Sequence, residues 1–253
     1  MNFFCAALKT IHRNSTWGLR RFLQRKGILK PRAGETVTVL SYPKSGRTWL
    51  RVMLDYLDIC TRFTHDTAES LHNSSHDFPV STDKDRYSKT RLVFLIRDPR
   101  DIVVSSYYHT VYKKGLFNGP ISSFIRHHKF GIEKTLRFQN CWLEHGAILS
   151  TFLLVSYEDM LGDTTGELMR IVRFAGAESY IREEQVNEAV EIFTFKTMQR
   201  LERSGLLRMR YGGMLRVKDK RDVKTFKVRS GGSGAYRREL SSEDISYCNA
   251  LIS

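Results

Sequence analysis

Two segments of the same design constrain what this chain can fold into. Each is an apolar run, then a short polar turn with fixed positive charge, then a helix-like pattern. The first spans residues 37–49 (Val-Thr-Val-Leu-Ser-Tyr-Pro-Lys-Ser-Gly-Arg-Thr-Trp) and the second spans residues 92–105 (Leu-Val-Phe-Leu-Ile-Arg-Asp-Pro-Arg-Asp-Ile-Val-Val-Ser). Strand–turn–helix corners of this kind aim a loop at a ligand, and backbone N–H groups at the helix start meet its phosphates. The pair therefore predicts an α/β protein with a site for an anionic nucleotide.

The first turn combines a permissive backbone with a mobile charge. Gly46 lets the backbone approach an anion closely, and Lys44 adds a charged side chain. Apolar residues at helical spacing predict a helix from Thr48 to Leu57, so Thr48 would offer a hydroxyl and an N–H group in its first turn. An ordinary corner with exposed Lys and Arg side chains fits this single segment about equally well.

The second turn separates residues that start a helix from residues that face a ligand. Asp98 is a good N-cap, Pro99 fits the first helical position, and Asp101 falls where a capping-box residue would sit. Arg97 differs, because it stands at the carboxyl end of a strand, where ligands bind. Ser105 lies two helical turns beyond Asp98 and on the same face. Arg97 and Ser105 together could hold one phosphate.

With these residues in place, segments 42–49 and 97–105 resemble the two signatures of sulfotransferases that use 3′-phosphoadenylyl sulfate (PAPS). Three weaker matches follow in family order. They are residues 152–160 (Phe-Leu-Leu-Val-Ser-Tyr-Glu-Asp-Met), 195–198 (Phe-Lys-Thr-Met) and 229–236 (Arg-Ser-Gly-Gly-Ser-Gly-Ala-Tyr). Five ordered matches are more specific than any one of them. The chain is identified on this basis as similar to a bacterial-type member of the PAPS-dependent sulfotransferases.

The resemblance runs from about Thr36 to Leu240 and implies an architecture. That architecture is a three-layer α/β sandwich with a central parallel sheet, the P-loop-kinase-like sulfotransferase fold. One sulfotransferase domain is expected at residues 33–253, after a basic extension at residues 1–32. Length and an apolar content of 41% agree with one sizeable domain.

The resemblance also implies a role for individual residues in donor binding. Lys44 would lie near the bridging oxygen of the phosphosulfate. The loop around the 5′-phosphosulfate would be Tyr42, Pro43, Lys44, Ser45, Gly46, Arg47 and Thr48. The 3′-phosphate would be bound by Arg97, Ser105, Arg229, Ser230 and Gly231. Adenine would be surrounded by Trp49, Tyr157 and Phe195.

Several positions depart from the family pattern: Phe193 stands where a Thr often contacts adenine, Phe63 stands where animal enzymes usually have Lys, and Arg47 and Ser230 differ as follows. Arg47 stands where animal cytosolic enzymes usually have Thr, so an extra charge would touch the sulfonate. Ser230 replaces the common Lys, which weakens the expected contact with the 3′-phosphate.

A hydroxyl acceptor needs a general base, most often a histidine. His65 follows the β-like run 61–64, and Phe-Thr-His-Asp resembles the catalytic-histidine segment of bacterial members. A surface or N-capping His-Asp turn is the plain alternative. His76, in a second His-Asp pair, is the main competitor. Asp66 would either orient the imidazole or stay solvated.

The chemistry favours a site without a metal. Sulfuryl transfer passes through a loose in-line transition state, by analogy with phosphoryl transfer. Charge builds on the leaving 5′-phosphate, where Lys44 and loop N–H groups would meet it. The chain has no Gly-x-x-x-x-Gly-Lys-Ser/Thr motif. That absence counts against a Mg²⁺-dependent nucleotide or small-molecule kinase, which stays open as one alternative. A non-catalytic basic module that binds polyanions or membranes is the other.

Charge and cysteine usage bear on partners and compartment. The net charge is +14, and residues 1–32 hold eight Lys or Arg and no Asp or Glu. A membrane-surface helix and a solvated basic extension both fit that segment. Four cysteines form no C-x-x-C, so a reducing cytosol is expected, with peripheral contact to the inner membrane face if the segment binds lipid.

The acceptor is left open by the sequence. The expected acceptor is a glycan, glycolipid or small molecule with a hydroxyl or amine. Nucleic acid is not expected as a partner. Loops 66–89, 113–129 and 204–223 are expected to form the acceptor pocket.

Overall fold

A computed structural model describes residues 36–66, 87, 89–146, 149, 151–206, 217 and 219–253. The expected extension at residues 1–32, and with it the domain boundary, lies outside these residues. The fold is built on a parallel sheet with the strand order β2-β1-β3-β4. Its strands are β1 (Val37–Ser41), β2 (Thr61–Thr64), β3 (Arg91–Ile96) and β4 (Phe152–Ser156).

The strand order fixes where a ligand can bind. From β1 the chain passes through helix α3 (Arg47–Tyr56) to β2 on one side, and it reaches β3 on the other side of β1. Val39 accordingly pairs with Phe63 of β2 and with Val93 of β3. The point at which the order reverses lies between β1 and β3, and open α/β sheets bind ligands outside the carboxyl ends of their strands at such a point. The loops after β1 and β3 are therefore neighbours at the place where a ligand belongs.

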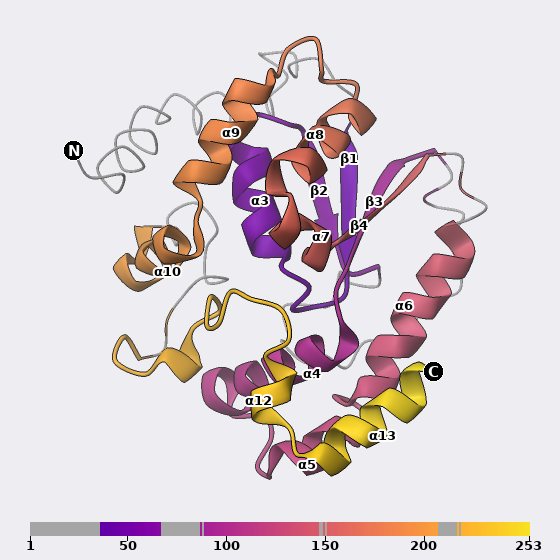
Figure 1. The fold of residues 1–253 in the computed structure, drawn as a ribbon, viewed down its shortest axis with the longest axis vertical. Helices are drawn as coiled ribbons and strands as arrows, with labels where there is room; N and C mark the ends of the chain where they lie inside the picture. The colour runs from indigo at the N-terminus through magenta and orange to yellow at the C-terminus, as the bar shows by residue number, and fades with distance from the viewer. Residues whose placement is uncertain are drawn as a thin grey trace.

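Alternating strand residues cover the two faces of the sheet. Val39 and Leu95 are fully buried on the face that packs on α3, α8 (Thr164–Phe174) and α9 (Glu183–Ile192). Leu40 and Phe94 are fully buried on the other face, against the helix α6 (Ile132–Gly146). Figure 1 shows the sheet between these helices. The three-layer α/β sandwich expected from the sequence is confirmed.

The helices after β3 and the C-terminal helices form a separate apolar cluster at the carboxyl edge of the sheet. This packing brings the segment between η5 (Val223–Thr225) and α12 (Tyr236–Glu239) beside α4 (Pro99–Tyr108), as Figure 1 shows. The other elements of this part are η3 (His109–Lys114), α5 (Ile121–Ile125) and α13 (Ser242–Ile252). The remaining helices are α7 (Tyr157–Gly162) and α10 (Phe195–Ser204).

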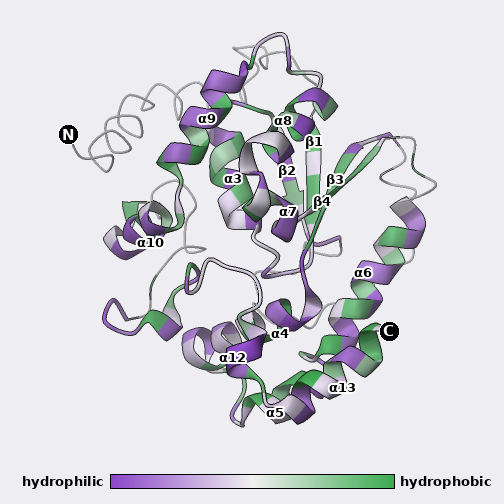
Figure 2. Cartoon of the chain, viewed as in Figure 1, coloured by the Kyte–Doolittle hydropathy of each residue, from purple (hydrophilic) through white to green (hydrophobic). Residues whose placement is uncertain are grey.

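Hydropathy follows these layers. In Figure 2 the strands are largely hydrophobic, whereas helices such as α6 carry both hydrophobic and hydrophilic residues along their length. The helix expected at 48–57 and the β-like run expected at 61–64 are observed as α3 and β2. Within the described ranges no helix is long and apolar enough to cross a bilayer.

Candidate active site

The loop after β1 is shaped to receive an anion. Lys44 and Gly46 both adopt left-handed backbone conformations, with φ of 76° and 88°. A Cβ atom on Gly46 would lie 2.3 Å from the Tyr157 ring, so only glycine fits there. Helix α3 starts directly after Gly46, with no side chain capping it and no acidic residue in its first turn. Its first N–H groups therefore stay available for a bound anion.

Lys44 sits in surroundings that disfavour its charge. Burial, followed by the nearby charge of Lys113, lowers the pKa of Lys44 to about 7, and Arg97 and Arg229 act in the same direction. Glu202 opposes this shift. An anion bound here would restore the ordinary preference of the lysine for its charged form.

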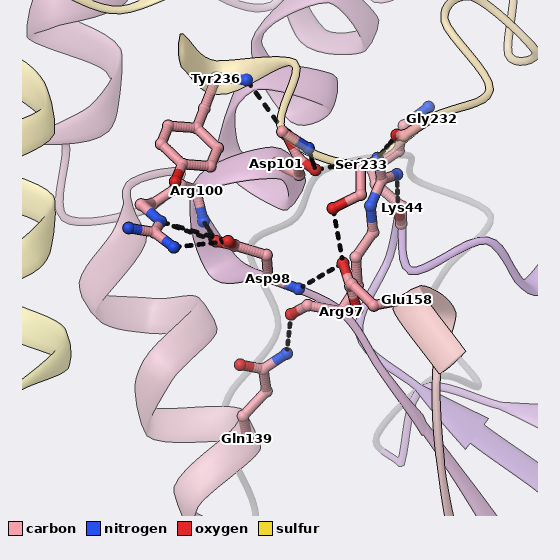
Figure 3. Close-up of polar contacts among 11 residues, drawn as sticks. Lys44, Arg97, Asp98, Arg100, Asp101, Gln139, Glu158, Gly232, Ser233 and Tyr236 are labelled. Atoms are coloured by element: carbon pink, nitrogen blue, oxygen red, sulfur yellow. Dashed lines mark hydrogen bonds and ion pairs between the residues drawn. The ribbon is translucent and has the colours of Figure 1, made fainter. Parts of the chain in front are cut away.

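Arg97 joins the loop after β1 to the C-terminal loop. Its Nη1 donates to the carbonyl oxygen of Lys44 at 3.3 Å, and its Nη2 donates to that of Gly232 at 2.8 Å. The guanidinium also lies 4.3 Å from the centre of the Tyr157 ring. Figure 3 shows Arg97, Lys44 and Gly232 converging at the end of β3. Gln139 of α6 fixes the backbone of Arg97 by donating to its carbonyl oxygen at 2.8 Å.

Two carboxylates in the first turns of α4 have different tasks: Asp101 holds the C-terminal loop, and Asp98 caps the helix. The fully buried Asp101 accepts from the backbone N–H groups of Gly234 at 2.7 Å and Tyr236 at 3.1 Å. Asp98 caps α4, as expected, by accepting from the N–H group of Arg100 at 2.9 Å. Asp101 does not play the helix-start role expected from its position. Its carboxylate points out of the first turn of α4 toward the returning C-terminal chain, as Figure 3 shows.

Glu158 braces the loops as a hydrogen-bond acceptor. Its Oε1 accepts from the N–H group of Asp98 at 3.2 Å and from Ser233 Oγ at 3.5 Å. The turns after β3 and β4 and the C-terminal loop are thereby tied together.

The residues expected around the 3′-phosphate come from three elements. Ser105 lies in α4, two turns after Asp98. Arg229 donates to Glu239 at 2.9 Å, and its guanidinium lies 3.9 Å from the centre of the Tyr108 ring. Ser230 is exposed beside Gly231, which has a left-handed φ of 62°.

The aromatic residues expected around adenine are partly brought together. The rings of Trp49 and Tyr157 meet edge to face, with centroids 6.0 Å apart. The Trp49 indole donates to the Phe193 carbonyl oxygen at 2.8 Å. Phe195, at the start of α10, packs on Gly231 so closely that a Cβ atom there would overlap the Phe195 ring. Trp49 and Tyr157 thus form one group, and Phe195 stands beside the 229–231 segment.

His65 stands at the carboxyl end of β2, next to the end of β1. Its Nδ1 lies 2.5 Å from the Ser41 carbonyl oxygen, and its Nε2 lies 2.6 Å from Nη2 of Arg47. A carbonyl can only accept and a guanidinium can only donate, so Nδ1 carries the proton and Nε2 accepts. Arg47 also donates to the Thr64 carbonyl oxygen at 2.9 Å. The neighbouring Asp66 accepts from the Trp142 indole at 3.2 Å.

The competing His76 lies outside the described residues, as do most of loops 66–89 and 204–223. Within the described chain, no group of three or more His, Cys, Asp and Glu side chains could hold a metal ion.

Sequence patterns did not point to Lys113, Lys227 or Glu202. Glu202 is almost fully buried, and its two oxygens accept from the N–H groups of Lys227 and Val228, each at 2.8 Å. Its Oε1 also lies 3.8 Å from Nζ of Lys113. The sequence did contain a signal for Glu202. The stretch from Arg200 to Arg238 is strongly basic, and an acidic residue within it is unusual enough to predict a structural partner.

Comparisons with known proteins show the family to which the chain belongs. The model of the sulfotransferase domain matches residues 64–253, which is more than half of the chain. The chain belongs to the sulfotransferase family. Flavonol 3-sulfotransferase from Flaveria bidentis is 24% identical to it over 85% of this chain and 80% of the relative. Human sulfotransferase 2A1 is 25% identical over 82% of this chain and 79% of the relative.

Solved structures resemble the sulfotransferase in fold. Mouse sulfotransferase SULT7A1, complexed with PAP, superposes with a TM-score of 0.62 at 16% identity, covering 86% of this chain and 82% of that one. Retinol dehydratase, in complex with androsterone and the inactive cofactor PAP, gives a TM-score of 0.58 at 20% identity, over 86% and 79% of the two chains. The sulfotransferase family predicted from the sequence is confirmed. The two alternatives, a nucleotide or small-molecule kinase and a non-catalytic basic module, are not supported.

Asp101→Asn should loosen the C-terminal loop, because an amide carries no charge and has one acceptor oxygen for two backbone donors. We expect the free energy of unfolding to fall by about 1–3 kcal/mol, measured by urea denaturation, with faster proteolysis in segment 229–236. Asp159→Asn, at an exposed carboxylate of α7, is the matched control and should change neither. Equal effects of the two substitutions would contradict the bracing role of Asp101.

Proposed function

We propose that the sulfotransferase transfers a sulfuryl group from PAPS to a hydroxyl or amine of its acceptor. The observation that supports this most strongly is the position of Arg97. It binds the backbone of the loop after β1 and of the C-terminal loop at once, between the two segments expected to hold the two ends of the donor.

The donor would lie along these two loops. Its 5′-phosphosulfate would meet the N–H groups of residues 45–48 at the start of α3 and the Lys44 side chain. Its 3′-phosphate would meet Arg97, Ser105 and residues 229–231. Trp49 and Tyr157, with Phe195 beside Gly231, would enclose the adenine.

The reaction exchanges one bond to sulfur for another. The acceptor oxygen forms a bond to sulfur and gives its proton to Nε2 of His65. The bond between sulfur and the bridging oxygen breaks, and that oxygen leaves with the electron pair on the 5′-phosphate. Lys44 stabilises the charge that develops there. The ammonium of Lys44 and the backbone N–H groups stabilise this charge, and the transferred group itself carries little charge, so a metal is unnecessary.

Arg47 has two tasks in this scheme. Without donor it donates to Nε2 of His65, the atom that must receive the proton. A guanidinium beside an imidazolium is disfavoured, because both carry positive charge. We propose that Arg47 turns to the sulfonate when donor binds, so that the acceptor hydroxyl takes its place at Nε2. The Nδ1 bond to Ser41 would hold the ring throughout.

The relatives bear on the acceptor, and the cysteines bear on the location. The relatives include a flavonol 3-sulfotransferase and, in Cavia porcellus, a 3-beta-hydroxysteroid sulfotransferase. A small hydroxyl compound is thus proposed alongside a glycan or glycolipid. Cys60, Cys141 and Cys248 are free thiols, in keeping with the proposed cytoplasmic location. Peripheral membrane contact through residues 1–32 is retained as a proposal.

The first test is donor binding without metal. Calorimetry should show that adenosine 3′,5′-bisphosphate (PAP) binds equally well with EDTA and with Mg²⁺, because cationic side chains and N–H groups provide the contacts. ATP, which has no 3′-phosphate for Arg97, should bind much more weakly. A strict Mg²⁺ requirement, or preference for ATP, would contradict the proposal.

Lys44 should make PAP binding dependent on pH. Its pKa is lowered to about 7 in the free protein and should rise when phosphate binds. Binding should therefore take up protons above pH 7, and the affinity should fall by up to about tenfold per pH unit as pH rises. Calorimetry at pH 7.5–9 in buffers of different ionisation enthalpy measures both quantities.

Lys44→Arg is the control for this pH dependence, because arginine stays charged throughout the range. The variant should lose the part of the proton uptake that belongs to Lys44 and show a flatter affinity profile. Identical uptake by the two proteins would show that Lys44 does not face the phosphate.

His65→Ala should remove turnover while PAP affinity stays nearly unchanged. Loss of a general base typically costs about 10²–10⁴-fold in rate. Transfer of labelled sulfate from PAPS to a flavonol, used as probe acceptor, measures turnover. His76→Ala serves as the comparison. An active His65→Ala protein beside an inactive His76→Ala protein would move the base to His76.

A further inference from the structure

The transferring end of the site is the part where the phosphosulfate of the donor would lie. More positive charge surrounds it than the donor can neutralise. We call this set the transfer-end cations: Lys44, Arg47, Arg51, Lys113 and Lys227. They come from the loop after β1, from α3, from η3 and from the loop after η5.

Glu202 gathers two of the transfer-end cations. The same Oε1 atom lies 3.8 Å from Nζ of Lys113 and 2.8 Å from the backbone nitrogen of Lys227. The Lys113 side chain is only 10% exposed, yet its Nζ makes no hydrogen bond within the described structure. An ammonium group held away from water with one distant carboxylate is costly, unless a ligand completes its contacts.

Arg47 and Arg51 extend the charge toward the proposed base. They lie one turn apart on α3, and both reach β2. Arg47 contacts Nε2 of His65 at 2.6 Å, and the Arg51 guanidinium lies 4.1 Å from the centre of the Phe63 ring.

The five groups also influence one another electrostatically. Burial, and then the charges of Lys44, Arg47, Lys113 and Arg51, lower the pKa of Lys227 well below its usual range. Lys227 is thus electrostatically coupled to the other transfer-end cations, and its backbone nitrogen lies beside Glu202.

Counting formal charges shows the surplus. Arg51 is left out of the count, and Lys44, Arg47, Lys113 and Lys227 then face the carboxylate of Glu202, which leaves three positive charges when all four are protonated. The phosphosulfate brings two negative charges, one on the 5′-phosphate and one on the sulfonate. At the other end, Arg97 and Arg229 are already matched by Asp101 and Glu239.

We propose that the acceptor of this sulfotransferase carries an anionic group, a carboxylate or a sulfonate-like group, close to the hydroxyl that is sulfated, and that Lys113 and Lys227 bind this group. The inference rests on the proposed function, because it takes the donor as PAPS. It narrows the acceptor from any hydroxyl compound to an acidic one.

The experiment compares matched phenols on the protein loaded with PAP. The probes are 4-hydroxybenzoate, 4-hydroxybenzenesulfonate and the neutral 4-hydroxybenzamide. Calorimetry on the full chain should show at least one anion binding tenfold or more tightly than the amide. Sulfate transfer from PAPS should favour the same anion in kcat/KM. Comparison of 4-hydroxybenzoate with 4-hydroxybenzenesulfonate shows whether the site prefers a carboxylate or a sulfonate.

Substitutions test which residues cause the preference for the anionic phenol. Lys113→Met and Lys227→Met should each reduce the preference for the anion at least threefold, with PAP affinity measured separately in each. Lys114→Met is the control, because Lys114 is the next residue of η3 and is exposed. It should keep the wild-type preference.

Failure of this inference is distinguishable from failure of the proposed function. If PAP does not bind, the donor assignment fails. If PAP binds and neither anion binds more tightly than the amide, the anionic acceptor is refuted, whatever the variants do. A preference that survives both Lys113→Met and Lys227→Met would refute the assignment to these residues.

Discussion

The hydrogen bonds of Arg97 to two backbone carbonyls hold the site together. One carbonyl belongs to Lys44 and the other to Gly232, residues far apart in the chain. Arg97 can reach both because it leaves β3 at the point where the strand order reverses. Asp101, one turn later, fixes the same C-terminal loop by its backbone. The two ends of a nucleotide can then be bound by loops with a fixed separation.

The same geometry concentrates positive charge in a partly buried place. The pKa of Lys44 is lowered because burial and neighbouring cations oppose its charge. Repulsion of this kind destabilises the free site, and a polyanion relieves it on binding. Binding energy is thus linked to proton uptake, and donor should stabilise the fold by mass action. Arg47 contacts His65, and in the proposed mechanism this contact makes donor binding and release of the base one event.

The sequence predicted local structure well and long-range contacts poorly. The strand–turn–helix corners, the cap at Asp98 and the strand before His65 follow from short patterns, and the structure has them. Asp101 was misread because its position within the helix suits a cap, whereas its partners lie more than 130 residues later. Lys113 and Glu202 meet only because η3 and α10 approach in the fold. Spacing along the chain carries no information about such a meeting.

The most direct measurement of the central claim is a crystal structure of the sulfotransferase with PAP bound. The account predicts the 5′-phosphate over the N–H groups at the start of α3 beside Lys44, and the 3′-phosphate between Arg97, Ser105 and Arg229. It also predicts that Arg97 still bridges the Lys44 and Gly232 backbones. A nucleotide bound in the opposite direction, or bound away from the ends of β1 and β3, would contradict the account.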